Sequence, residues 1–217
     1  MAFDKFKDLW NQKERSFKRI DSRQSLVIFM DCKDVTSDHS HFDLSGSDPI
    51  YRIMADCAYR VAVESDLSCT IYAAIDEVSI IFSDPKKLVG YFRVGDCADY
   101  LCSLYLQRFL RHFWKYYPKI NLKSTVFPLS QCDTGRYLQY RKEVAQTVAM
   151  FYVAKQSLPA SKYRDLPFSS SPVRRLLEDE GLMDILAKNK DFFNGIKKEY
   201  FSDNLGDWFA DCMRLKK

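Results

Sequence analysis

The sequence contains little glycine and proline and lacks any segment that could enter a membrane. Only 7 glycines and 7 prolines occur among 217 residues, which argues against long loops, and no repeat of a solenoid period is present. No window approaches the roughly 18 consecutive apolar residues of a membrane-spanning helix. Residues 1–17 also lack the apolar run of a signal peptide. We therefore expect a cytoplasmic, intracellular protein that does not contact membranes.

Several common classes of site are also missing. The 7 cysteines include no CxxC pair, so neither a zinc ribbon nor a thioredoxin-type site is supported. Most of the cysteines lie among apolar residues and are expected to be reduced core thiols, as in intracellular proteins. No GxxxxGK[ST] sequence occurs, which excludes a P-loop. A bound triphosphate would therefore have to be held by separate cations and by metal ions.

The composition is that of a globular chain with a well-filled core. Hydrophobic residues make up 47% of the chain and charged residues 29%, close to the averages of folded domains. The length suits one domain, or one domain with a helical extension. A net charge of +4 and a pI of about 8.6 are only mildly basic, so they fit an ordinary soluble protein as well as a nucleic-acid-binding one.

The hydrophobic pattern predicts strands and helices in a recognisable order. Strands are expected at 25–30, 69–75, 78–83 and 122–127. Helices are expected at 3–20, 50–65, 97–117 and about 135–156. Pro49, preceded by Ser47 and Asp48 as possible caps, favours the start of the second helix. The order β-α-β-β-α-β predicts an α+β fold, a ferredoxin-type antiparallel sheet with helices on one face and a helical C-terminal extension.

Three carboxylates are expected to meet at one end of this sheet. Asp31 ends the first strand, and only Asp76 and Glu77 separate the second strand from the third. A two-residue connection defines a tight hairpin, and a pair of acids is a locally costly turn, which often marks a site. In this topology Asp31 and Asp76 lie close enough to share metal ions.

Such carboxylates suit phosphoryl or nucleotidyl transfer. Two divalent ions about 3.5–4 Å apart can hold the attacking and leaving oxygens, and Mg²⁺ needs few carboxylates because water and phosphate complete its shell. The pattern therefore predicts a two-metal catalytic site at Asp31, Asp76 and Glu77. A solvated acidic turn is the structural alternative.

Cations at helical spacing suggest an RNA-binding track. They are Arg108, Arg111 and Lys115 on the helix at 97–117, and Arg136 belongs to a second basic cluster. A solvated helix face is the alternative for the first three. His39 and His41 lie in the polar loop after Asp31, where they either contact a phosphate or are simply exposed.

Several segments together resemble the tRNA-His guanylyltransferase family and its Thg1-like relatives. LVIFMDCK and AAIDEVSIIF resemble the family's Arg-Leu-Asp-Gly-Arg and Ser-Asp-Glu-Tyr-Ser-Phe-Val-Phe segments. KSTVFPLSQCDTGRYLQYRKE and SSSPVRRLLEDEG resemble later family segments, in the same order over about residues 25–200. Phe29, Cys32 and Ile75 replace an arginine, a glycine and a serine of the pattern, so the chain resembles a divergent member.

The resemblance implies a polymerase-like palm and its chemistry. It implies an N-terminal helix in 1–24, a palm-like catalytic domain at 25–157 and a helical extension at 158–217 packed on the palm. The implied enzyme is a nucleotidyltransferase of tRNA processing that adds nucleotides in the 3′-to-5′ direction to the 5′ end of tRNA or another structured RNA. It would use two Mg²⁺ ions with GTP or ATP, and would form a homo-oligomer, a tetramer by family analogy.

The resemblance also implies roles for individual residues. Asp31 and Asp76 would be metal ligands, the backbone carbonyl of Cys32 would contact one ion, and Glu77 would support the metal site. The cations that would face triphosphate oxygens are Lys33, Lys123 and Arg141, and the loop histidines His39 and His41 would reach a phosphate.

Two other functions fit the same residues. The replacements at Phe29, Cys32 and Ile75 suggest a catalytically degenerate palm that acts as an RNA- or nucleotide-binding module. A palm-type nucleotide cyclase would use the same strand-end acids. The sequence does not specify which RNA or which nucleotide is used.

Overall fold

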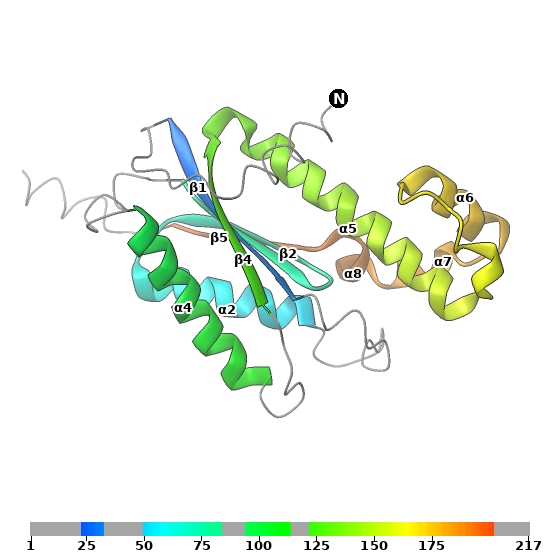
Figure 1. Ribbon diagram of the computed structural model, residues 1–217, viewed down its shortest axis with the longest axis horizontal. Helices are drawn as coiled ribbons and strands as arrows, with labels where there is room; N and C mark the ends of the chain where they lie inside the picture. Colours follow the sequence, from blue (N-terminus) through cyan, green and yellow to red (C-terminus); the bar gives the residue numbers. More distant parts are fainter. Residues whose placement is uncertain (1–22, 33–49, 84–93, 114–121, 202–217) are drawn as a thin grey trace, which may run out of the picture.

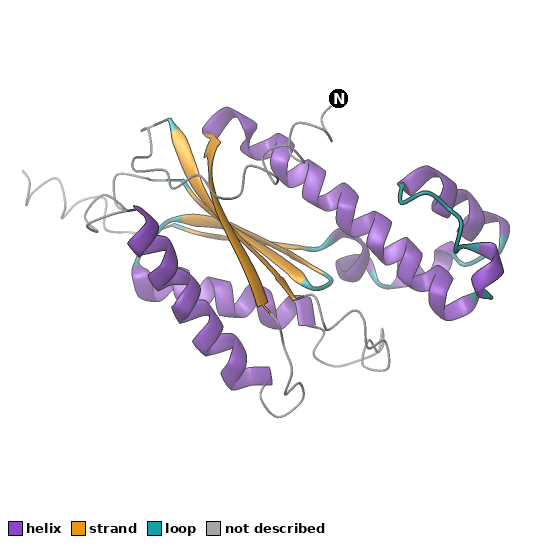
Figure 2. Cartoon of the chain, viewed as in Figure 1, coloured by secondary structure: helices purple, strands orange, loops and turns teal. Residues whose placement is uncertain are grey.

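The computed structural model describes residues 23–32, 50–83, 94–113 and 122–201. The helix expected at 3–20 lies outside these ranges. In the described part, strands and helices alternate through the first two thirds of the chain and helices dominate the last third (Figures 1 and 2).

Five strands form one antiparallel sheet in the order β4-β1-β3-β2-β5. Their bounds are β1 Gln24–Cys32, β2 Cys69–Ala74, β3 Glu77–Phe82, β4 Leu122–Ser130 and β5 Ile196–Tyr200. The first four have the order of the ferredoxin-type fold, so the predicted fold class is confirmed. The fifth strand, which the sequence pattern did not indicate, extends the sheet beside β2.

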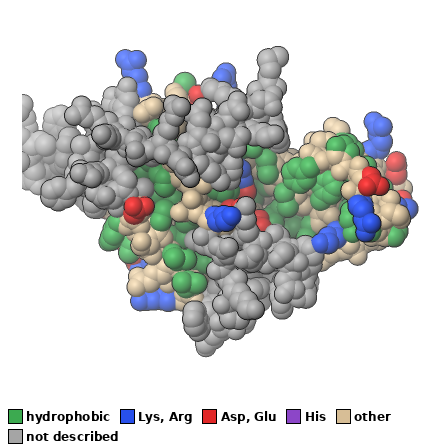
Figure 3. Space-filling view, in the orientation of Figure 1, with side chains coloured by type: hydrophobic (Ala, Val, Ile, Leu, Met, Phe, Trp, Pro, Cys, Tyr) green, Lys and Arg blue, Asp and Glu red, His purple; other side chains and the backbone are tan. Residues whose placement is uncertain are grey.

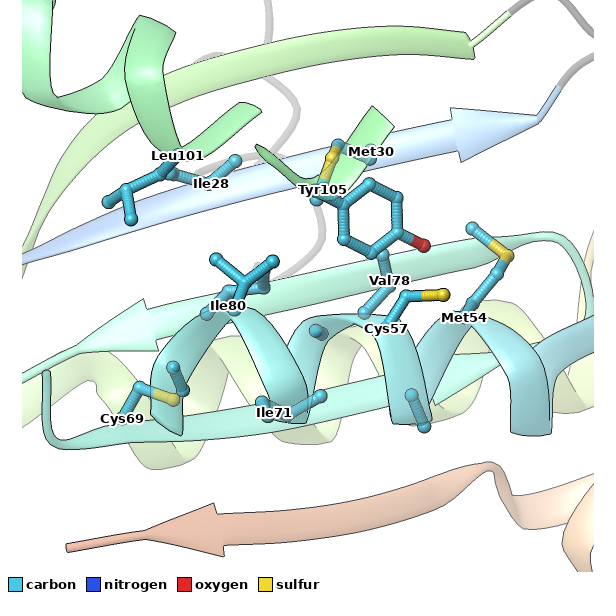
Figure 4. Close-up of a cluster of buried hydrophobic side chains, with 14 of the residues drawn as sticks. Ile28, Met30, Met54, Cys57, Cys69, Ile71, Val78, Ile80, Leu101 and Tyr105 are labelled. Atoms are coloured by element: carbon cyan, nitrogen blue, oxygen red, sulfur yellow. The ribbon is translucent and has the colours of Figure 1, made fainter. Parts of the chain in front are cut away.

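Two helices, α2 Ile50–Ser65 and α4 Val94–Phe113, cover one face of the sheet (Figure 1). Ile28 and Met30 of β1 and Ile80 of β3 point towards them, and Met54 of α2 and Tyr105 of α4 fill the space between (Figure 4). These side chains are buried. Alternation along each strand places every second residue in this core, so the intervening residues face the opposite side of the sheet.

The long helix α5, Thr134–Ser157, crosses the opposite face. Its N-terminal half packs Tyr137 against Phe29 and Phe127, and the Tyr137 hydroxyl lies 2.9 Å from the buried Ser79 Oγ. Its C-terminal half extends beyond the sheet (Figure 1), where it packs against the C-terminal helices. This face therefore contains a buried pair of hydroxyl groups, those of Ser79 and Tyr137.

The C-terminal helices are short and lie beside the end of α5. They are α6 Ser170–Asp179, α7 Met183–Lys188 and α8 Lys190–Asn194, preceded by a 3-10 turn at Ala160–Lys162. A second 3-10 turn, Gln131–Asp133, joins β4 to α5. No helix in the described ranges is both long enough and apolar enough to cross a membrane.

Four cysteine side chains are described, and all four are free thiols. Cys57 and Cys69 are buried in the α2–α4 core, as predicted, and Cys102 is partly buried. Cys132 is exposed, so it is not a core thiol. It follows the edge strand β4, where no helix of the core covers it.

Candidate functional site

The tip of the β2–β3 hairpin lies one residue earlier than the sequence predicted. The two turn residues are Ile75 and Asp76, and Glu77 already belongs to β3, where it pairs with Ala74. Ile75 has a φ of 55°, in the left-handed region that β-branched residues rarely adopt. Its side chain is only 2% exposed and packs among the α5–α8 residues. Burial of this side chain explains why Ile75 leaves the strand.

Asp31 lies within β1, with a charged partner on each side. It stands directly opposite Glu77 of β3 and directly opposite Lys123 of β4. Directly opposed side chains have Cβ atoms about 4.5–5.5 Å apart, and like charges in this position are destabilising. The row Lys123–Asp31–Glu77 therefore needs a further cation near its two acids.

Arg141 of α5 supplies that cation. Its Nε donates a hydrogen bond of 3.0 Å to Glu77 Oε1, and its Nη2 donates to Glu77 Oε2. The guanidinium also lies 4.4 Å from the centre of the Phe29 ring. A bidentate arrangement of this kind is among the stronger charge-assisted contacts in proteins, so the position of Arg141 is tightly fixed.

Arg141 also interacts electrostatically with the other two acids of the site. Burial lowers the pKa of Arg141 to about 10, although Tyr72, Asp31 and Asp76 each act to raise it. The group is therefore still positively charged at neutral pH. Asp31, Asp76 and Glu77 thus surround one buried guanidinium.

A second set of contacts joins this site to the C-terminal part of the chain. Tyr72 of β2, on the same face of the sheet as Glu77, donates a hydrogen bond of 3.0 Å to the backbone oxygen of Asn194. Gln146 of α5 donates one of 2.9 Å to the Asn194 side chain. Sequence reasoning did not select Tyr72 or Asn194. Alternation along β2 was the signal that could have placed Tyr72 on this face.

The structure brings together five of the residues that the sequence selected. They are Asp31, Asp76, Glu77, Lys123 and Arg141. Cys32 ends β1 directly after Asp31. Four further selected residues, Lys33, His39, His41 and Lys115, lie outside the described residues.

The proposed RNA-binding cations lie elsewhere. Arg108 and Arg111 belong to α4, which packs on the opposite face of the sheet, and Arg108 Nε donates to Glu64 Oε2 at 2.9 Å. Arg136 is exposed near the start of α5 and pairs with Asp133 at 3.5 Å. None of the three joins the carboxylates.

The carboxylates differ in whether they could bind a metal ion. In the described ranges no group of three histidine, cysteine, aspartate or glutamate residues has the arrangement of a metal site. Glu77 already gives both oxygens to Arg141, which leaves two carboxylates, both half-buried. Two carboxylates with one backbone carbonyl still suit Mg²⁺, which keeps several waters or phosphate oxygens in its shell. Asp31 and Asp76 supply the carboxylate oxygens that Mg²⁺ prefers, and water and phosphate would have to complete its shell.

The surface around the sheet carries charges of both signs. Figure 3 shows basic and acidic side chains close together near the centre of the face in view, and hydrophobic, basic and acidic side chains mixed on the right.

Comparison with known proteins finds solved structures of similar fold. No family model and no curated protein matches the chain. A bacterial tRNA(His) guanylyltransferase (Thg1)-like protein in complex with ATP has a TM-score of 0.58 and 16% identity, over 91% of this chain and 83% of that one. The corresponding GTP complex has a TM-score of 0.55 and 18% identity, over 77% and 80%.

A eukaryotic structure gives the same result. The tRNA(His) guanylyltransferase of Saccharomyces cerevisiae has a TM-score of 0.63 and 15% identity, over 93% of this chain and 98% of that one. At such low identity the comparisons establish the fold. This chain has the fold of the Thg1-like tRNA(His) guanylyltransferases, as its sequence resemblance predicted.

Proposed function

We propose that this protein is a nucleotidyltransferase that uses GTP or ATP and acts on the 5′ end of tRNA or another structured RNA. The observation that carries the proposal is the group of Asp31, Asp76 and Glu77 around one buried guanidinium, in a fold shared with the guanylyltransferases. Two of the similar structures are complexes with ATP and GTP, which supports these nucleotides as ligands.

In this proposal each group of the site has a separate task. Asp31 and Asp76, with the Cys32 carbonyl, hold two Mg²⁺ ions. When bound, these ions neutralise the phosphate oxygens at the reacting centre. Lys123 is exposed and stands opposite Asp31, so its amine can reach triphosphate oxygens. Lys33, His39 and His41 would add contacts to the same phosphates.

The direction of addition and the RNA contacts belong to the same proposal. Addition in the 3′-to-5′ direction requires the 3′-hydroxyl of the incoming nucleotide to attack an activated 5′ end. Arg111, Lys115 and Arg136 would contact the RNA backbone, and Arg108 would take part only if it left Glu64. Three further expectations also stay predictions. They are the tetramer, the cytoplasmic location and the domain bounds 1–24, 25–157 and 158–217.

Transfer of a radiolabelled nucleotide to RNA tests this function. The protein is incubated with labelled GTP, Mg²⁺ and tRNA bearing a 5′-triphosphate, and label at the 5′ end is measured. We expect Asp31→Asn and Asp76→Asn each to lower the rate at least about 100-fold, because each removes a charge that the transition state needs. The matched control is Asp184→Asn on the exposed side of α7, which should transfer at the wild-type rate. Undiminished transfer by both site variants, with circular dichroism showing folded protein, contradicts the proposal.

One observation favours a second candidate, a catalytically inactive nucleotide-binding module. Because Glu77 is fully engaged by Arg141, only two side-chain carboxylates remain for ions. Calorimetry with GTP and Mg²⁺, carried out beside the label-transfer assay, separates the cases, because this module would bind the nucleotide yet transfer no label. Cyclic products formed without RNA would instead indicate a cyclase.

A further inference from the structure

Arg141 and Glu77 form an ion pair with little contact to solvent. The Arg141 side chain is 5% exposed and that of Glu77 is 14% exposed. The Phe29 ring lies against the guanidinium at 4.4 Å. A triphosphate arriving from solvent would therefore find little of Arg141 to bind, unlike the exposed Lys123.

The pair also limits what Glu77 can do. Each of its two carboxylate oxygens accepts a hydrogen bond from Arg141. Direct coordination of a cation by Glu77 would compete with these bonds. Breaking a buried pair leaves an uncompensated charge, which is strongly unfavourable, so Glu77 has a strong reason to stay with Arg141.

The formal charges of the site show what the pair achieves. Arg141 reduces the three negative charges of the carboxylates to two, before the exposed Lys123 opposite Asp31 is counted. Without Arg141 the acids would carry three negative charges, with Asp31 directly opposite Glu77, where like charges repel. Arg141 interacts with Asp31 and Asp76 as well as with Glu77, so it acts on all three.

We infer that Arg141 and Glu77 act on the cation site through charge: Arg141, held by Glu77 and Phe29, reduces the negative charge around Asp31 and Asp76, and Glu77 holds Arg141 in place without binding the cation. This inference rests on the proposed function, because it assumes that Asp31 and Asp76 receive divalent cations. Neither residue of the pair contacts the nucleotide phosphates.

Binding of Mn²⁺ alone, followed by electron paramagnetic resonance of the free ion, tests this inference without relying on activity. Four proteins are compared: wild type, Glu77→Gln, Arg141→Gln and the double variant. Asp31→Asn identifies binding at this site, since it should leave the signal of free Mn²⁺ undiminished. The double variant removes both buried charges together, so it leaves no single buried charge unpaired. It therefore remains informative if one of the single variants unfolds.

The charges dictate the direction of each effect. One unit charge about 6 Å from a divalent ion changes its affinity about tenfold even at the dielectric constant of water. Arg141→Gln should therefore bind Mn²⁺ about tenfold more tightly, and Glu77→Gln about tenfold more weakly. The double variant restores the net charge and should bind within about threefold of wild type. Tighter binding by Arg141→Gln is a result that loss of structure would not produce.

The other outcomes overturn the inference in distinguishable ways. If Glu77 is a direct ligand, the double variant stays more than about tenfold weaker than wild type. If Arg141 contacts phosphates, the double variant binds GTP more weakly than wild type when EDTA removes the metal ions. Lys123→Gln should show the same loss of GTP affinity, because Lys123 is proposed to contact the triphosphate. A wild-type protein that binds no Mn²⁺ overturns the inference together with the proposed function, whereas the first two results leave the proposed function standing.

Discussion

Ile75 joins two properties that seldom occur together in one residue. Its backbone has a φ of 55°, and its side chain is buried with Tyr51, Val153 and Phe192. The left-handed conformation costs about 1–3 kcal/mol for such a residue, and burial of the side chain offsets this cost. Ile75 directly precedes Asp76, and its backbone conformation sets the direction in which the chain leaves β2.

Substitutions at Ile75 should reverse the usual order of alanine and glycine. Ile75→Ala loses the buried side chain and keeps a Cβ in the left-handed region, so we expect a loss of about 2–4 kcal/mol of unfolding free energy. Ile75→Gly loses the same contacts but relieves the backbone, and should be about 1 kcal/mol more stable than Ile75→Ala. Urea unfolding measures both. A less stable glycine variant would show that the turn is not left-handed.

The acids and their cation differ in how far the sequence could predict them. Asp31 and Asp76 were found because strand ends and hairpin turns are local features, readable within a few residues. The contact between Glu77 and Arg141 joins residues 64 positions apart and depends on how α5 crosses the sheet. The resemblance selected Arg141 as a triphosphate ligand, and its burial against Phe29 was visible only in the structure.

The junction between β2 and β5 connects the site to the C-terminal elements. Gly195, which has a φ of +73°, lies between α8 and β5. A Cβ at this position would lie 2.6 Å from the Tyr72 hydroxyl and 2.7 Å from its ring carbon Cζ. The close approach lets Tyr72 bond to Asn194, so glycine is needed both for its backbone and for its size.

Two glycine-to-alanine variants separate the requirement for a positive φ from the requirement for a small residue. Gly181, after α6, has a φ of +67° and open space where a Cβ would be. We expect Gly181→Ala to cost about 1 kcal/mol, the backbone term alone, and Gly195→Ala to cost at least about 2 kcal/mol. Thermal unfolding of both variants measures the difference. Equal losses would mean that Tyr72 moves aside freely and does not hold the junction.

The elements themselves were predictable to different degrees. The helix predicted at 50–65 has the bounds of α2, because Pro49 and an apolar stripe define it locally. The strand β5 was missed, because its sequence IKKEY has too few apolar residues to signal a strand. Lysines are common on edge strands, where they discourage pairing with other chains, so its place at the sheet edge explains the missing signal.

Among the described residues, Cys57 and Cys69 are buried thiols of the α2–α4 core. Burial raises the pKa of Cys57 to about 11 and that of Cys69 to about 12, from an ordinary value of 9.0. Above pH 9 the unfolded chain releases these protons while the folded protein keeps them. The unfolded state then binds fewer protons, so the free energy of unfolding falls as the pH rises.

The unfolding free energy should therefore fall as the pH rises, and replacing one buried thiol should make this fall less steep. Between about pH 9 and about pH 11 each buried thiol should lower the unfolding free energy by up to about 1.4 kcal/mol per pH unit. Cys69→Val should remove one such contribution, whereas Cys132→Ser, at an exposed position, should leave the slope unchanged. Urea unfolding over this range gives the slopes. An identical slope in Cys69→Val would refute the assignment.

The most direct measurement of the central claim is a crystal structure of this protein with GTP and Mg²⁺. Divalent ions should be held by the carboxylates of Asp31 and Asp76 and by the triphosphate, with Glu77 still paired to Arg141. Saturating GTP and Mg²⁺ that leave these two carboxylates without an ion, or place the nucleotide away from the ends of β1 and β3, would contradict it.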